Sequence, residues 1–231
     1  MKFLARMQAP LGVLTLIALA VGLWMVWNAP ADFQQGGAVR ILYLHVPSAK
    51  MSLFCYVFLT IASIVHLWKR SETADILAEA ATAVGISFTG ITLASGAIWG
   101  KPMWGTWWAW DARLTSMLVL LILYKGLMVL RHSMDDPTKG ARATAILAIV
   151  GAVDLPIIHY SVVWWRTLHQ PPSLAAAEKS GIHISGPLLP PLLAMSVAFI
   201  LMGVYMLTLK ARQIEAQRKL DALEAARLHH E

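Results

Sequence analysis

The most chemically distinctive part of the chain is a short segment rich in tryptophan. It runs from Trp99 to Asp111 with the sequence WGKPMWGTWWAWD and holds five of the ten tryptophans. Indole rings offer a broad and rigid contact surface with few rotatable bonds. The segment therefore suits a flat apolar ligand such as a porphyrin, a quinone or a lipid. The alternative is an aromatic belt, which anchors membrane helices at the water interface.

The spacing within this segment predicts a short helix. A helix over residues 104–111 would place four side chains on one face, at positions i, i+3, i+4 and i+7. These side chains are Trp104, Trp107, Trp108 and Asp111. We expect such a helix to lie flat on the membrane surface. Asp111 also precedes the next apolar run, where an aspartate commonly caps free backbone N–H groups, and a second role for it stays open.

Two histidines could bind a metal beside this aromatic surface. His45 lies in YLHVP, before a proline suited to the first turn of a helix, and His169 lies in WWRTLHQPP, after an apolar run. Imidazole is a common iron ligand, and two imidazoles on opposite faces of a porphyrin give six-coordinate heme. Each histidine could instead be an ordinary interfacial side chain. The candidate cations for heme propionates are Lys101, Arg113 and Arg166.

The composition indicates which elements position these residues. Hydrophobic residues make up 58% of the 231 residues and charged residues only 14%, against about 25% charged in ordinary soluble domains. Runs of about 20 apolar residues predict membrane-spanning helices. We expect an all-α integral membrane protein with a six-span domain over residues 1–210 and a cytoplasmic helical tail over 211–231. The predicted spans are about 11–27, 43–67, 82–99, 113–130, 142–165 and 188–209.

Basic residues in the connectors predict the orientation, because cytoplasmic loops are enriched in lysine and arginine. The side that holds both termini carries twelve of them and the other side six. Both termini are therefore expected in the cytoplasm, with an uncleaved first span. The loop charges also explain the net charge of +6 without a nucleic-acid partner.

The tryptophans follow the outer side of this topology. Nine of them lie there and only Trp68 lies at the inner face. Aromatic belts form at both interfaces, so a belt alone does not explain this distribution. The segment from Trp99 to Asp111 is thus expected to face outward together with His45 and His169.

Cysteine content and motifs exclude several functions. Cys55 is the single cysteine, which excludes an internal disulfide, a CxxC redox pair and covalent heme attachment through CxxCH. The chain has no GxxxxGK[ST] motif, so it does not bind ATP through a P-loop of its own.

Three stretches resemble a known family. HVPSAK, WGKPMWGTWWAWDARLTS and LPIIHYSVVWWRTLHQ are similar to the heme exporter protein C family of cytochrome c maturation, within the tryptophan-rich WWD heme-handling group. The motif match runs from about residue 32 to residue 170, and the six-span layout covers the whole chain. The resemblance implies non-covalent binding of heme b at the periplasmic face of the bacterial inner membrane.

The resemblance also implies site residues and partners. The family's axial heme ligands match His45 and His169. The motif that would support the porphyrin and help dock a partner matches Trp104, Trp107, Trp108, Trp110 and Asp111. Heme would pass to a membrane-tethered heme chaperone, protein E of the maturation system. An ATP-binding subunit, a second membrane subunit and a small single-span subunit would complete an ABC-type complex in the lipid membrane, in which this chain is not an enzyme.

Two other functions stay open. A membrane b-type cytochrome for electron transfer needs histidines on facing helices across the bilayer, which one-sided ligands disfavour. A heme transporter with a path through the helices would draw on Asp154, Pro156 and His159 in AVDLPIIHY. An ionisable residue within the membrane is functional by default, although Asp154 could simply bond a neighbouring helix.

Overall fold

The structure, a computed structural model, is built of helices that match the apolar runs. It describes residues 2–165, 167–169 and 186–228, and these contain no named β-strand. Six helical stretches are long and apolar enough to span a membrane, which confirms an all-α, multi-span membrane protein. The elements are α1 (Lys2–Trp27), η1 (Gly37–Ile41), α2 (Leu42–Lys69), α3 (Glu72–Trp104), α4 (Ala112–His132), α5 (Pro137–Gly151), α6 (Asp154–Trp164), η2 (Gly186–Leu188) and α7 (Leu189–Leu228).

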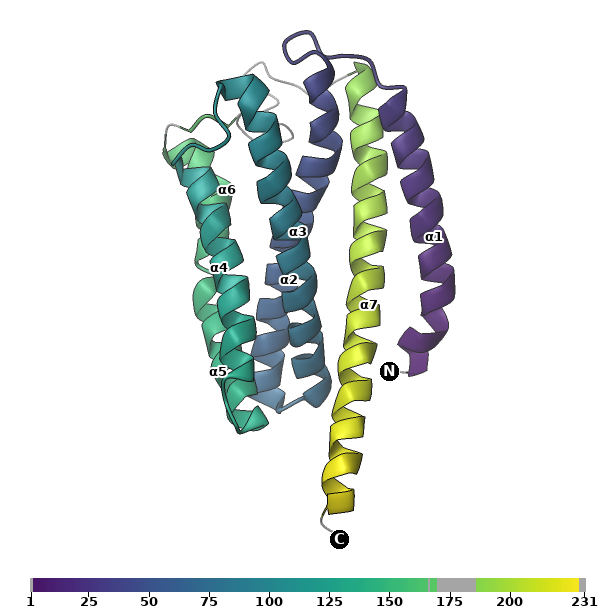
Figure 1. Cartoon of the computed structure of the whole chain (residues 1–231), viewed down its shortest axis with the longest axis vertical. Helices are drawn as coiled ribbons and strands as arrows, with labels where there is room; N and C mark the ends of the chain where they lie inside the picture. The colour runs from purple at the N-terminus through teal and green to yellow at the C-terminus, as the bar shows by residue number, and fades with distance from the viewer. Residues whose placement is uncertain (1, 166, 170–185, 229–231) are drawn as a thin grey trace.

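The helices lie side by side in one bundle (Figure 1). Helices α2 and α3 pack together in its middle, α4 to α6 lie on one flank, and α1 packs along α7 on the other. We call the end where α3 leads into α4 the tryptophan end, at the top of Figure 1. The opposite end, where α2 turns into α3 and beyond which α7 extends, is the tail end.

Aromatic side chains interlock the central helices. Tyr124 of α4 is fully buried, and its hydroxyl donates to the Ser52 carbonyl oxygen of α2 at 2.8 Å. Gly85 of α3 lies directly against the Tyr124 ring, where an added Cβ would overlap it. Because α2, α3 and α4 are locked together here, their tryptophan ends are held in fixed relative positions.

The third span begins earlier than predicted. Helix α3 starts at Glu72 and not near residue 82, because the Ser71 side chain accepts from the Ala74 N–H at 3.2 Å and caps it. The polar first turns hid this start from a hydropathy pattern. At the other end of the chain, α7 runs without a break from Leu189 to Leu228, across the predicted boundary at residue 210.

The fifth span is divided into two helices. Helix α5 ends at Gly151, a turn follows, and α6 begins at Asp154. Pro156 stands in the first turn of α6, where the N–H that it lacks has no intrahelical partner. The break therefore falls just before this proline, between two helices that together make one span.

The prediction of a short interfacial helix over 104–111 was wrong. Helix α3 continues through Pro102 to Trp104, and residues 105–111 are bends and irregular backbone. Gly105 ends the helix because it adopts a left-handed conformation with φ 76°, which glycine reaches without strain. The helical spacing of the tryptophans in this segment is therefore not realised.

Candidate functional site

The tryptophan segment links α3 to α4, and its indoles differ in how exposed they are. The Gly105 N–H donates to the Lys101 carbonyl oxygen at 3.0 Å, and the chain then turns toward α4. Trp107 and Trp110 are largely exposed, with 56% and 78% of their surface accessible. Trp104 and Trp108 are half-buried. The segment thus offers two indoles to the surroundings and holds two against the protein.

Asp111 has two structural roles. Its Oδ1 atom accepts from the Leu114 N–H at 2.8 Å and so caps the first turn of α4. Its Oδ2 atom accepts from His169 Nδ1 and from the Leu168 N–H, both at 3.3 Å. The carboxylate is only 8% exposed. Capping alone therefore does not account for this residue, which also holds the connector that carries His169.

The contact with Asp111 orients the His169 imidazole and fixes which of its nitrogens carries the proton. A carboxylate can only accept, so the His169 Nδ1 atom carries the proton and Nε2 keeps a free lone pair. A metal-bound histidine usually has such a partner on its other nitrogen. The Trp104 ring lies edge-on to the imidazole, 4.9 Å between centroids. Burial lowers the pKa of His169, which favours the neutral ring, while Asp111 acts in the opposite direction.

His45 is oriented in the same way by a different partner. Its Nδ1 atom lies 3.1 Å from Ser95 Oγ, whose own hydrogen is donated to the Ile91 carbonyl oxygen at 2.7 Å. The serine oxygen therefore accepts from Nδ1, and His45 Nε2 is left as the free nitrogen. Trp99 contacts this imidazole edge-on at 5.6 Å, and Gly96 leaves room for the ring. His45 lies in the first turn of α2, within the span predicted over 43–67.

The two histidines share one neighbourhood with an arginine. His169 and Arg113 both lie near enough to His45 to interact electrostatically with its imidazole. Arg113 Nη2 donates to the carbonyl oxygens of Ile158 and His159 at 3.5 Å and 3.4 Å. Its Nε atom is buried without a hydrogen-bond partner among the described residues, so one N–H is available for an anion. Two imidazoles, several indoles and a cation thus lie near one another at the tryptophan end.

Known proteins are similar to this chain over most of its length. The sequence profile of the heme exporter protein C family matches residues 1–226. The chain belongs to the heme exporter protein C family. Heme exporter protein C of Bradyrhizobium diazoefficiens is 45% identical over 220 residues, 95% of this chain and 83% of that protein. The Escherichia coli K12 protein of the same name is 50% identical over 161 residues, 69% of this chain and 66% of its own length.

The name of a third relative, which is less similar in sequence, states the biological process in which that protein takes part. A mitochondrial protein of Marchantia polymorpha, described as ccmC-like and as a protein of cytochrome c biosynthesis, is 42% identical over 199 residues. That alignment covers 86% of this chain and 83% of the relative. The family resemblance carried by the tryptophan and histidine motifs is thereby confirmed.

The remaining residues that the sequence predicted for the site have other surroundings. Trp108 and Trp110 contact each other at 5.5 Å between ring centroids. The Lys101 ammonium donates to the Gly105 carbonyl oxygen at 3.1 Å, which caps the end of α3. Arg166, the third candidate cation, lies outside the described residues. Arg113 is therefore the candidate whose position beside the histidines the structure supports.

Sequence reasoning missed the residues that hydrogen-bond to His45 and Trp99 and so hold them in place. Ser95 orients His45, and Gln35 accepts the indole N–H of Trp99 at 3.0 Å. These partners lie 50 and 64 residues apart in the chain. No local pattern joins residues at such separations, and only the folded bundle brings them together.

Asp154 does not take part in this site. It is buried at the start of α6, and its Oδ2 atom has no hydrogen-bond partner in the part of the chain that the structure describes. The fully buried Tyr56 hydroxyl also has none, and it lies against Gly151 at the end of α5. Two buried polar groups, of Asp154 and Tyr56, thus lie near the break between α5 and α6, within the membrane-spanning part and apart from the histidines.

Proposed function

We propose that this chain binds heme b non-covalently at the tryptophan end and passes it to a membrane-tethered heme chaperone during cytochrome c maturation. Membership of the heme exporter protein C family supports a non-enzymatic role in heme handling within an exporter complex. The observation that carries the proposal is that the imidazoles of His45 and His169 are both held through their Nδ1 atoms. Each has its Nδ1 hydrogen engaged, by Ser95 and by Asp111, so each offers Nε2 to iron.

The surroundings of the two imidazoles suit the rest of a heme molecule. Trp99 and Trp104, which touch the two rings edge-on, would contact the apolar porphyrin. The free N–H of Arg113 would bind a propionate through a charge-assisted hydrogen bond. The exposed indoles of Trp107 and Trp110 would cover the outer side of the ring and meet the chaperone.

The two ligands differ in how firmly the protein holds them. His45 is part of a membrane-spanning helix, whereas His169 lies on a connector that follows α6. Connectors move more readily than packed helices, because fewer contacts fix them. We therefore expect His169 to leave the iron first when heme is handed over, with His45 as the last protein ligand.

The same proposal places the chain in a membrane and a complex. The excess of basic residues at the tail end supports cytoplasmic termini, which puts the heme site at the periplasmic face of the inner membrane. We propose as partners the chaperone, an ATP-binding subunit that hydrolyses ATP, a second membrane subunit and a small single-span subunit.

Heme spectra of the full-length protein test the site. His45→Ala and His169→Ala are expected to lose the low-spin spectrum of bis-histidine heme, with total heme counted by pyridine hemochrome. His132→Ala is the matched control, because that histidine is exposed at the tail end and bonds only its own helix. If both site variants kept full heme with an unchanged spectrum, the ligand assignment would be wrong.

One observation favours a second candidate, a heme path through the bundle. The unpaired Asp154 oxygen beside a helix break is the kind of intramembrane polar group that transport pathways use. Asp154→Asn would then abolish heme delivery while heme binding at His45 and His169 persists. Unchanged delivery by this variant would remove the path and leave the surface site alone.

A further inference from the structure

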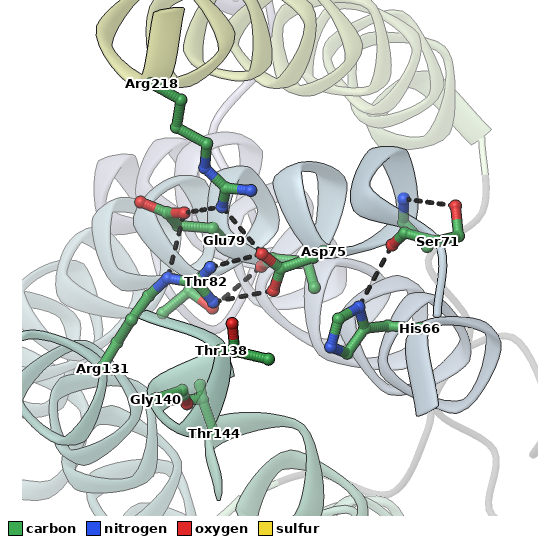
Figure 2. A network of polar contacts seen from close by, with 12 residues as sticks. His66, Ser71, Asp75, Glu79, Thr82, Arg131, Thr138, Gly140, Thr144 and Arg218 are labelled. Carbon is green, nitrogen blue, oxygen red and sulfur yellow. Dashed lines mark hydrogen bonds and ion pairs between the residues drawn. The ribbon is translucent and has the colours of Figure 1, made fainter. Parts of the chain in front are cut away.

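The tail end contains a network of four charged residues that joins three helices (Figure 2). Arg131 of α4 binds Asp75 through two hydrogen bonds, at 2.9 Å and 2.5 Å, and its Nε atom lies 3.0 Å from Glu79. Arg218 of α7 lies 2.8 Å from Asp75 and 2.7 Å from Glu79. Asp75 and Glu79 of α3 are therefore both paired with arginines, and the four residues of the network carry no net charge.

A hollow lies beside this network, between α2, α3, α4, α5 and α7. Its volume is about 230 Å³. Small side chains create the space on two of its walls, with Ala78 on α3 and Ala145 on α5. Ser63 of α2 also lines it, and its hydroxyl is buried, 1% exposed, without a hydrogen-bond partner among the described residues. The hollow therefore presents an unsatisfied polar group within mostly apolar walls.

A second hollow of about 460 Å³ adjoins the first. It is an open groove between α3 and α7, lined mainly by apolar side chains such as Val84, Met206 and Leu209. Ala83 and Lys210 line both hollows, so they mark the junction. The two spaces are therefore neighbours, one on the apolar flank of the bundle and one toward its polar tail end.

Lys210 at this junction is a cation without a matching carboxylate. Its ammonium donates to Gln213 Oε1 at 3.1 Å, and no carboxylate lies within ion-pair distance in the described part of the chain. Asp75 and Glu79 line the neighbouring hollow but are already bound by Arg131 and Arg218. A lysine at the end of a membrane span lies at the depth of the lipid headgroups. The site therefore has an uncompensated positive charge where phosphate groups are abundant.

We propose that these two adjoining hollows bind an acidic phospholipid from the leaflet at the tail end. The phosphate binds the Lys210 ammonium, and one acyl chain lies along Val84, Met206 and Leu209 in the groove between α3 and α7. The polar headgroup extends into the smaller hollow, where the Ser63 hydroxyl is available to it. A lipid fits better than free phosphate because the groove offers apolar surface that only an acyl chain can cover.

Native mass spectrometry of the full-length protein, released from detergent, tests the lipid site. The probes are phosphatidylglycerol and phosphatidylcholine with identical acyl chains, each added in a titration. We expect phosphatidylglycerol to bind more tightly, and Lys210→Gln to weaken it about five-fold, which is what one lysine contributes at an anionic membrane surface. Lys139→Gln is the matched control, because Lys139 is an exposed lysine at the same end, paired only with Asp136.

A second variant tests the acyl-chain part of the proposal. Ala83→Leu fills the junction of the two hollows and should lower phosphatidylglycerol binding while the heme spectrum of the distant site stays unchanged. The proposal is overturned if both lipids bind equally, if the two lysine variants lose the same affinity, or if Ala83→Leu binds as the wild type does. Displacement of the lipid by millimolar inorganic phosphate would show a small-anion site and would also overturn it.

Discussion

Replacing Asp111 by asparagine separates its two roles. Asparagine caps helices about as well as aspartate, so one oxygen can still accept from the Leu114 N–H. The amide then directs an NH₂ group toward His169 Nδ1, where a carboxylate oxygen accepted a hydrogen before. Two donors cannot bond each other. His169 must therefore move its proton to Nε2, the nitrogen that iron requires, or lose its partner.

The size of the effect follows from the partner that is lost. Removing the group that orients a metal-bound histidine commonly weakens metal binding by about 10- to 100-fold, or about 1.4 to 2.8 kcal/mol. Asp111→Asn should show this loss of heme affinity with little change in thermal stability. Asp111→Ala should lose the same affinity and in addition about 1 kcal/mol of stability, because the cap of α4 is removed.

The assay is a heme titration of the purified full-length protein, followed by absorbance, together with a thermal unfolding curve. Asp136→Asn is the control, since Asp136 caps α5 through the N–H groups of Thr138 and Lys139 and has no histidine beside it. It should leave both heme affinity and spectrum unchanged. Wild-type heme affinity and an intact low-spin spectrum in Asp111→Asn would refute the role given to this carboxylate.

Three further predictions follow from other contacts. Ser95→Ala removes the acceptor for His45 Nδ1 and should weaken heme binding about ten-fold in the same titration, whereas an unchanged affinity would contradict the assigned tautomer. Arg113→Gln should reduce the affinity for heme but not for heme dimethyl ester, since only free propionates carry the charge that it binds. Gly85→Ala should lower the free energy of unfolding by about 1 to 3 kcal/mol, because the added methyl group overlaps the Tyr124 ring. An unfolding curve identical to that of the wild type would contradict the close packing of α3 against α4.

The sequence predicted the spans better than it predicted their ends. Apolar runs locate spans because the bilayer demands about 20 apolar residues. The start of α3 escaped this pattern because Asp75 and Glu79 lie in it, and their charges are neutralised by arginines from α4 and α7. Pairing between residues more than 50 positions apart leaves no trace in a local window.

The tryptophan segment shows a different limit. The spacing of its indoles fitted a helix, but Gly105 adopts a positive φ that ends α3 instead. Asp111 was expected to cap the following span, and it does so. Its second contact, with His169, joins residues 58 positions apart and could only come from the folded chain. Residue types thus identified the candidate ligands, while tertiary contacts decide how each one is held.

If heme binds as we propose, Asp111 would allow the site to be well ordered and still release heme. Its cap on α4 fixes the carboxylate to a helix that Tyr124 locks into the bundle. Two contacts at 3.3 Å, with His169 Nδ1 and with the Leu168 N–H, join the carboxylate to the segment that carries His169. If both contacts broke, His169 would be released while the cap, the helices and His45 stayed in place. Under the proposed function, heme release would then require no repacking of the core, because only the contacts of Leu168 and His169 change.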